Sequence, residues 1–217
     1  MPSVTDLTGP AGPLEAILDA PESDPTALRA AVVFAHPHPQ YGGTMHTKAV
    51  YQGAKGLVRI GCAVLRFNFR GVGRSAGEFD QGDGEKADFK AALDYMAARY
   101  PAVPLWAAGF SFGAWVALEV GAGDDRVTTL IGIAPPVVTS VSGQHYTFEQ
   151  TLASTKPKFF VQGEEDEVCP IEGLRAFYAR LEEPKEMATI DAADHLFDGK
   201  TQEVGEALED LLSDYPS

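Results

Sequence analysis

The sequence predicts an α/β fold with one mostly parallel central sheet flanked by helices. Short β-rich runs alternate with helical patterns along almost the whole chain, an order that is typical of α/β domains. Most of the expected strands are continuous apolar runs, as strands buried on both faces of a parallel sheet tend to be. The chain has 217 residues, of which 45% are hydrophobic, and this is enough for one sizeable core. We therefore expect a single domain over residues 1–217.

Seven β-rich runs make up the predicted sheet. In chain order the expected strands are 14–19, 30–35 (AAVVFA), 61–67 (GCAVLRF), 104–109 (PLWAAG), 128–134 (TTLIGIA), 158–162 (KFFVQ) and 186–190 (EMATI). Helical patterns lie between these runs, so consecutive strands are expected to be joined by crossover helices.

Two of the expected helices have a clear apolar stripe. The helix at 85–100 has apolar residues at i, i+4, i+7 and i+11, namely Phe89, Leu93, Met96 and Tyr100. The helix at about 201–213 carries acids on its outer face and, on its inner face, Val204, Leu208 and Leu211. Both stripes are interpreted as packing against the sheet, and the acidic face as a solvated surface.

The charge balance argues against polyanionic partners. Lys and Arg number 17 against 31 Asp and Glu, so the formal net charge is -14. Such a charge repels phosphate backbones and anionic membrane surfaces. The N-terminus has neither a basic start nor an apolar run, and no stretch approaches the roughly 20 apolar residues of a membrane span. We expect no nucleic-acid partner, no membrane partner and no secretory signal.

The two cysteines are Cys62, in an apolar run, and Cys169, in an acidic loop. They are too few for a disulfide framework and wrongly spaced for zinc, and Cys169 is expected to pack as a small apolar residue. A cytoplasmic location is therefore expected, whereas a periplasmic one would require a signal upstream of this sequence.

The stretch GVGRSAG (71–77) fits two different motifs. Its glycines match the dinucleotide fingerprint GxGxxG/A, and Ser75 with its flanking glycines matches the nucleophile elbow GxSxG. Both motifs need a helix that opens directly after them, but an acidic stretch with two glycines, EFDQGDGE, follows here and predicts a loop. The stretch is interpreted as a loop at the edge of the sheet, in which Arg70 and Arg74 pair with acids of EFDQGDGE.

A second elbow match, GFSFG (109–113), has the context that the first one lacks. The expected strand PLWAA precedes it, and FGAWVALEV, rich in helix formers and free of proline, follows Ser111. A serine on a sharp strand-to-helix turn is presented at the edge of the sheet with the helix dipole behind it. We therefore predict that Ser111 is a nucleophile.

A serine nucleophile needs a base within hydrogen-bond reach and a third group that orients the base. In one known chain order, serine precedes the acid and the acid precedes histidine, which leaves His145 and His195 as candidates downstream of Ser111. His195 is favoured because it lies in a loop between the last expected strand and the last helix, from which it can reach over the sheet edge. No strand that ends in an acid precedes His145.

The orienting acid is expected in KFFVQGEEDEVCP, where an apolar strand ends in a glycine and four acids. The four candidates are Glu164, Glu165, Asp166 and Glu167. A short side chain at the turn of a loop holds a fixed geometry best, which favours Asp166.

The chemistry also needs N–H donors for an oxyanion, usually one after the nucleophile and one from a loop after an early strand. Phe112 would supply the first. The second is expected in HPHPQYGGT, where proline lacks an N–H and the candidates are His38, Gln40 and Tyr41. Substrate contacts are expected from Gln40, Tyr41 and Tyr146.

The histidines of the same loop have an alternative interpretation as a metal site, formed by His36, His38 and His46. No carboxylate is interleaved at ligand spacing, and the prolines restrict the backbone, so this interpretation is not favoured. No metal and no organic cofactor is expected.

With GFSFG, GEEDEVCP and ADHLF in that order, the chain resembles the α/β-hydrolase superfamily from about residue 28 to 213. Three further blocks, HPHPQYGGTMHTKAV, RFNFRGVGRSAGEFDQGDGE and GFSFGAWVA, look like those of the small, lidless bacterial hydrolases related to dienelactone hydrolases. True dienelactone hydrolases are less similar, because they use cysteine at the position of Ser111. The substrate of dienelactone hydrolases is therefore not expected to be the substrate of this chain.

The resemblance implies a triad of Ser111, Asp166 and His195, since the family's acid lies three residues after the glycine and ahead of a closing proline. It also aligns the family's HGxP-like oxyanion loop with residues 36–39, which points to the N–H of His38. Pro37 replaces the usual glycine there, so the resemblance leaves open whether His38 or a neighbouring residue donates the hydrogen bond to the oxyanion.

We therefore expect a serine hydrolase that cleaves small carboxylic esters through an acyl-enzyme in an open cleft for short acyl groups. About 24 residues separate the strands near 130 and 160, too few for a large cap domain. Two alternatives stay open, namely another acyl substrate (thioester, lactone or peptide) and a catalytically idle scaffold used for binding. If His195 is the base, activity should fall as the pH drops through the range in which histidine titrates.

Overall fold

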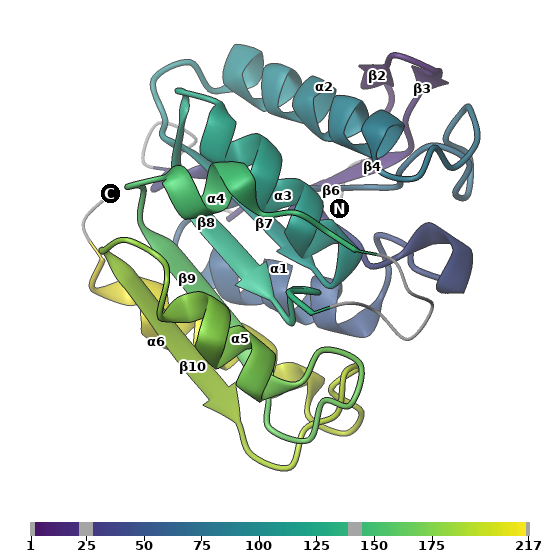
Figure 1. Cartoon of the computed structure of the whole chain (residues 1–217). Coiled ribbons are helices and arrows are strands. Elements are labelled where there is room, and N and C mark those ends of the chain that lie inside the picture. The colour runs from purple at the N-terminus through teal and green to yellow at the C-terminus, as the bar shows by residue number, and fades with distance from the viewer. Residues whose placement is uncertain (1–2, 22–27, 139–144, 216–217) are drawn as a thin grey trace.

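The computed structural model describes residues 3–21, 28–138 and 145–215 of the chain. Its centre is an eight-stranded sheet with the strand order β1-β4-β6-β5-β7-β8-β9-β10 (Figure 1). The parallel strands are β5 (Ala31–Ala35), β6 (Ala63–Phe67), β7 (Leu105–Phe110), β8 (Val127–Ile133), β9 (Lys158–Gly163) and β10 (Lys185–Ile190). Two antiparallel strands, β4 (Ala16–Asp19) and β1 (Ser3–Val4), extend one edge. The sheet is mostly parallel, as the sequence predicts.

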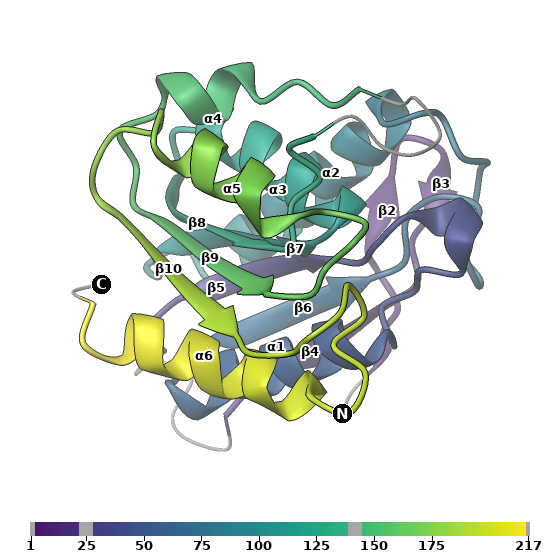
Figure 2. The same ribbon diagram turned by 60° about the horizontal axis from the view of Figure 1, so that its bottom comes forward.

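Helices cover both faces of this sheet (Figure 2). One face carries α1 (Lys48–Arg59) and α6 (Thr201–Ser213). The other face carries α2 (Asp83–Arg99), α3 (Phe112–Gly123), α4 (Glu149–Ala153) and α5 (Ile171–Tyr178). Side chains of one strand alternate between the two faces, so in β5 Val32 packs with the α1 and α6 side and Val33 with the α2 and α3 side. Because both faces are buried, the strands are continuous apolar runs.

The seven expected strands are all present, with ends that differ from the predicted ones by at most two residues. The helix predicted at 85–100 is α2, in which Phe89, Leu93 and Met96 are fully buried and Tyr100, the residue after its end, is partly buried. The helix predicted at about 201–213 is α6, and its Leu211 is only partly buried. Both stripes pack against the sheet as expected.

Helix α1 was not singled out by the sequence pattern, because two glycines interrupt its apolar stripe. The structure explains one of them: a Cβ on Gly56 would lie 2.2 Å from the carbonyl oxygen of Gly205 in α6. Glycine at this position allows the two helix backbones to pack closely, at a cost of about 1 kcal/mol in helix propensity relative to alanine. A tertiary contact therefore accounts for a residue that disfavours the helix locally.

Parallel strands place their carboxyl ends at one edge of the sheet, and the loops that leave β5, β6, β7, β9 and β10 meet there. A 3-10 turn, η2 (Pro39–Tyr41), lies in the loop after β5, and a small hairpin of β2 (Thr8–Gly9) and β3 (Gly12–Pro13) lies beside α2 (Figure 1). In the part of the chain that the structure describes, no helix has the length and apolar character needed to cross a membrane.

Candidate active site

Ser111 lies on a strained turn between β7 and α3. Its backbone angles are φ 54° and ψ -122°, a conformation that side-chain-bearing residues rarely adopt and that often marks functional sites. The glycines of GFSFG allow the turn: a Cβ on Gly109 would lie 2.1 Å from the carbonyl oxygen of Gly113, and one on Gly113 would lie 2.4 Å from that of His36. The sequence context that favours Ser111 over Ser75 therefore selects the residue that has the backbone geometry of a nucleophile elbow.

The structure brings the three predicted side chains into one hydrogen-bonded relay. His195 Nε2 lies 3.0 Å from Ser111 Oγ, and His195 Nδ1 lies 2.8 Å from Asp166 Oδ2. The Asp166 side chain is fully buried and that of His195 is 14% exposed, so the relay runs from the interior to the surface of a cleft. This geometry can transfer the hydroxyl proton of Ser111 to the imidazole as the oxygen attacks an electrophile.

Asp166 is the one buried acid of its loop, whereas Glu164, Glu165 and Glu167 are exposed. Its Oδ1 accepts hydrogen bonds from the backbone N–H groups of Val168 (2.9 Å) and Cys169 (2.7 Å). A short acid at the turn can accept these bonds while its second oxygen faces the imidazole, which is the geometric reason for aspartate here.

His195 reaches the relay from the loop between β10 and α6. Its ring lies 5.3 Å from that of Phe110, the last residue of β7, and this contact supports the imidazole from below the cleft. His145 and His46 are exposed, and the described hydrogen bond between a histidine ring and Ser111 is that of His195.

The loop after β5 lies against the turn that carries Ser111. Phe112 is the first residue of α3, where backbone N–H groups have no partner within the helix. Of the other candidate donors, the N–H of Gln40 donates to His38 Nδ1 (3.2 Å) and that of Tyr41 to the His38 carbonyl (3.1 Å). Both donors are engaged within the loop, so in this conformation neither points to a bound substrate.

His36 is buried under this loop and holds it in place. Its Nδ1–H donates to the Pro37 carbonyl (2.6 Å), and its Nε2 accepts from the Phe69 N–H (3.1 Å). Burial lowers the pKa of His36 to about 4, so the ring is neutral at physiological pH. The Pro37 carbonyl belongs to the same peptide group as the His38 N–H, and this ring therefore helps to fix the direction of that N–H.

Acidification should destabilise the protein through His36. Because its pKa is lower in the folded chain than the ordinary value of about 6.5 in the unfolded chain, its contribution is complete above pH 6.5 and is lost as the pH falls toward 4. Full loss corresponds to about 3 kcal/mol. Urea unfolding at pH 7 and pH 4.5 should show a larger drop for wild type than for His36→Gln. An exposed control, His46→Gln, should keep the wild-type drop, and an equal drop in all three proteins would contradict the assignment.

The GVGRSAG stretch forms a loop, and α2 begins only at Asp83. Ser75 is buried and has a structural role: its Oγ donates to the Asn68 carbonyl (2.7 Å) and accepts from the Glu15 N–H (2.9 Å). These bonds join the loop to β4 and β6, which explains a serine at this position without any chemistry.

The predicted ion pairs of this loop are only partly correct. Arg70 has a weak contact with Asp80 of EFDQGDGE (3.8 Å), but its close bidentate partner is Asp88 in α2, at 2.8 and 3.0 Å. Arg74 pairs with Glu15 at 2.9 Å and not with that stretch. The prediction considered acids close in sequence, whereas the fold places a buried helix acid and a residue from the N-terminal segment next to the loop.

A cleft of about 520 Å³ opens onto Ser111 and His195. Its walls are mainly apolar and aromatic: Pro37, His38, Tyr41, Phe112, Pro136, Val138, Tyr146, Val168, Cys169 and Leu196. Two of the three expected substrate contacts, Tyr41 and Tyr146, therefore line the cleft. The third, Gln40, is exposed and is not among the described residues of this lining.

Tyr146 is held in the wall by aromatic contacts. Its ring lies 4.7 Å from that of Trp115 and 6.0 Å from that of Phe112, and Trp115 Nε1 donates to the neighbouring Thr147 carbonyl (2.8 Å). Burial raises the pKa of Tyr146 to about 12, so the phenol stays neutral.

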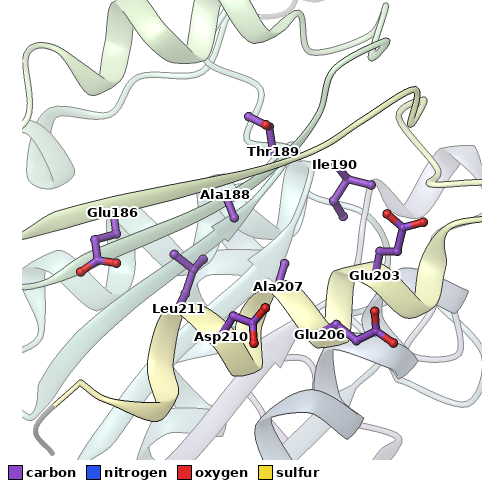
Figure 3. A pocket seen from close by; sticks show the side chains of 9 residues that line it. All are labelled: Glu186, Ala188, Thr189, Ile190, Glu203, Glu206, Ala207, Asp210 and Leu211. Carbon is purple, nitrogen blue, oxygen red and sulfur yellow. The ribbon is translucent and has the colours of Figure 1, made fainter.

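A second hollow lies between β10 and α6 (Figure 3). Four acids surround it, Glu186, Glu203, Glu206 and Asp210. It contains no serine, cysteine or histidine. It corresponds to the acidic outer face predicted for this helix, and we interpret it as a solvated surface.

Among the described residues, the ligating side chains close enough to share a metal ion are Asp166, Cys169 and His195. The histidine cluster considered from the sequence is not among them, because both ring nitrogens of His36 are hydrogen-bonded to the backbone. Burial raises the pKa of the Cys169 thiol, which disfavours the thiolate that a metal would require. The group is better explained as the relay itself with a small apolar neighbour.

The chain is similar to known proteins over nearly its whole length. A family described as "Alpha/beta hydrolase domain" matches residues 28–215. A protein from Rickettsia prowazekii (strain Madrid E), named "Uncharacterized protein RP471", is 38% identical over 212 residues, which cover 95% of this chain and 87% of that protein.

Two solved structures share the fold at comparable identity. An alpha-beta serine hydrolase homologue from Coxiella burnetii is 36% identical, with a TM-score of 0.87 and 97% of each chain covered. XC6422 from Xanthomonas campestris, described as an a/b serine hydrolase without lid, is 35% identical, with a TM-score of 0.85, and covers 96% of this chain and 92% of its own. These similarities span the elbow, the acid loop and the histidine loop.

Proposed function

The chain belongs to the alpha/beta-hydrolase family, as a small lidless member, and from that premise we propose that it hydrolyses uncharged carboxylic esters through an acyl-enzyme. One observation carries the proposal: Ser111, His195 and Asp166 are joined by hydrogen bonds of 3.0 and 2.8 Å at the floor of an apolar cleft. A serine with a correctly placed base and orienting acid is the arrangement of acyl-transfer hydrolases.

In the proposed reaction, Ser111 Oγ attacks the ester carbonyl while its proton passes to His195 Nε2. Asp166 holds the Nδ1–H of the ring and stabilises the imidazolium. The N–H groups of Phe112 and His38 would stabilise the oxyanion, each donor contributing about 3 kcal/mol to the transition state. His195 then gives the proton to the leaving alcohol. A water molecule, activated by the same ring, hydrolyses the acyl-enzyme and restores Ser111.

The size of the cleft supports short to medium acyl groups. The connection between β8 and β9 contains in its described part only the short helix α4, so no large cap covers the cleft. A volume of about 520 Å³ must accommodate both the acyl and the alcohol group of the substrate.

The mouth of the cleft supports an uncharged substrate. Three large hydrophobic side chains are exposed in the described part of the chain, Tyr41 at 76%, Leu196 at 53% and Val168 at 51%. All three line this cleft. Exposed apolar side chains gathered at a concave site are typical of ligand-binding surfaces. A carboxylate on the substrate would lose hydration against these walls and would be repelled by the net charge of -14.

A matched pair of chromogenic esters tests the proposal. The p-nitrophenyl esters of hexanoic acid and of adipic acid (monoester) have acyl groups of the same length, but the second carries a carboxylate, too far from its own ester to form a five- or six-membered anhydride. We expect kcat/KM to be higher for the hexanoate by roughly 10- to 100-fold, because the carboxylate must be partly desolvated. Leu196→Lys should narrow this ratio by placing a cation at the mouth, whereas the uncharged control Leu196→Met should preserve it.

The outcomes of this experiment distinguish an error in the substrate class from an error in the serine chemistry. Preference for the adipate, or an unchanged ratio of the two kcat/KM values in Leu196→Lys, would contradict the substrate class. Labelling by a fluorophosphonate with no turnover of either ester, but turnover of a thioester, lactone or peptide, would retain the serine chemistry and replace the substrate. Absence of labelling in folded protein would contradict the enzyme and favour a binding scaffold.

A further inference from the structure

A buried glutamine lies directly behind the orienting acid. Gln162 is the fifth residue of β9, after three consecutive apolar residues, and its side chain is fully buried. Its Nε2 donates to Asp166 Oδ2 (3.0 Å) and to the Cys169 carbonyl (2.9 Å). Among the described atoms, its Oε1 is buried and makes no hydrogen bond.

The orientation of this amide follows from its neighbours. Asp166 Oδ2 and the Cys169 carbonyl are both acceptors, so a reversed amide would place a third acceptor against them. The Nε2 group is therefore the end that faces Asp166. A buried carbonyl oxygen without a partner costs about 1–3 kcal/mol, which is why packing alone does not explain a glutamine in this strand.

The glutamine completes the set of donors around the Asp166 carboxylate. Two backbone N–H groups fix Oδ1, as described above. Oδ2 accepts from Gln162 Nε2 at 3.0 Å and from His195 Nδ1 at 2.8 Å. With donors on both oxygens, the carboxylate cannot rotate about its Cβ–Cγ bond without losing a bond. The second donor on Oδ2 also withdraws negative charge from the oxygen that faces the imidazole.

We propose that Gln162 is a positioning residue, which holds the Asp166 carboxylate in the plane that His195 requires and moderates its attraction for the protonated imidazole. The inference rests on the proposed function, because it assigns Gln162 a role in the same relay. Gln162 does not line the cleft, so it acts through Asp166 and not on the substrate.

Two near-isosteric variants test this role. Gln162→Met removes the donor and keeps the length of the side chain. We expect kcat on p-nitrophenyl butyrate to fall roughly 10- to 100-fold with KM nearly unchanged, because a misplaced relay slows the chemistry and leaves the cleft intact. Gln162→Glu keeps the shape of the side chain, and its buried carboxyl group stays protonated beside Asp166, because two carboxylates about 3 Å apart cannot both ionise. Its O–H can replace the missing N–H donor to Asp166, so Gln162→Glu should keep kcat within a few-fold of wild type at neutral pH and lower.

The control is Thr129→Val, which alters another buried polar side chain near the start of the adjacent strand β8, at the end of the sheet away from Ser111. Active sites are counted by fluorophosphonate titration, so that kcat refers to folded protein. The control should keep the wild-type kcat. Wild-type kcat in Gln162→Met, or a kcat in Gln162→Glu as low as that of Gln162→Met at neutral pH, would overturn the proposal.

Failure of both glutamine variants to fold would also overturn it, since the amide would then be a structural residue. A wild-type protein without ester turnover would contradict the proposed function and is recognised before any variant is compared.

Discussion

Replacement of Ser111 by alanine should lower kcat for p-nitrophenyl butyrate by roughly 10⁴- to 10⁶-fold, because the relay then has no nucleophile to activate. The hydroxyl lies 3.0 Å from His195 Nε2, and among the described residues that line the cleft Ser111 is the one serine. The cavity should persist in the variant, so binding of a product acid or an uncleaved ester should change little. Stopped-flow and end-point assays over hours together cover this range of rates.

Ser75→Ala is the matched control, since it removes the hydroxyl from the other GxSxG match. Its bonds to the Asn68 carbonyl and the Glu15 N–H would be lost, so the free energy of unfolding should fall by about 1–3 kcal/mol. Its kcat should stay within a few-fold of wild type. Loss of turnover in folded Ser75→Ala, or full activity in Ser111→Ala, would show that the elbow is assigned to the wrong serine.

Replacement of Asp166 by asparagine should lower kcat by about 10⁴-fold at neutral pH, with the fold intact. The two backbone N–H groups that hold Oδ1 would select the carbonyl oxygen of the new amide. Its NH₂ group would then face His195 Nδ1, so the imidazole would keep its proton on Nε2 and could not accept the proton of Ser111. The same NH₂ group would also meet Gln162 Nε2, placing two donors against each other.

The control for this variant is Glu164→Gln, which neutralises an exposed acid two residues earlier whose partner is Thr189. It should retain wild-type kcat, so that an effect of charge alone is excluded. The activity of Asp166→Asn is measured at several pH values together with fluorophosphonate labelling. Labelling of Asp166→Asn at the wild-type rate would contradict the role of Asp166 in orienting His195.

Local patterns predicted the sheet because each of its strands is buried on both faces. A short continuous apolar run such as AAVVFA, bounded by residues that break regular structure, is more easily explained as a buried strand than as a helix. The same patterns did not single out α1, where a glycine that disfavours the helix is required by close contact with α6. Helix propensity accounts for the cost of that glycine, but it contains no information on the contact with α6 that offsets the cost.

The partners of charged and polar side chains were predicted less well. Arg70 was expected to pair with acids a few residues away, but Asp88 is its bidentate partner because the loop folds back onto α2. Gln162 was not among the predicted site residues, since a polar residue at the end of an apolar strand is common. The role of its amide follows from the hydrogen bond that it donates to Asp166, four residues later, and this contact exists only in the folded chain.

The chemistry of the candidate site could be predicted from the sequence alone: a serine between a strand and a helix, an acid after a later strand and a histidine before the last helix, in one chain order. These features depend on local context, and local context can be read from one sequence. The identity of the buried acid, the N–H groups of the loop that are already engaged and the side chains that form the cleft walls are visible only in the folded chain. These depend on distances between segments far apart in the chain, such as the 84 residues between Ser111 and His195, and packing sets such distances through many weak contacts that no single motif encodes.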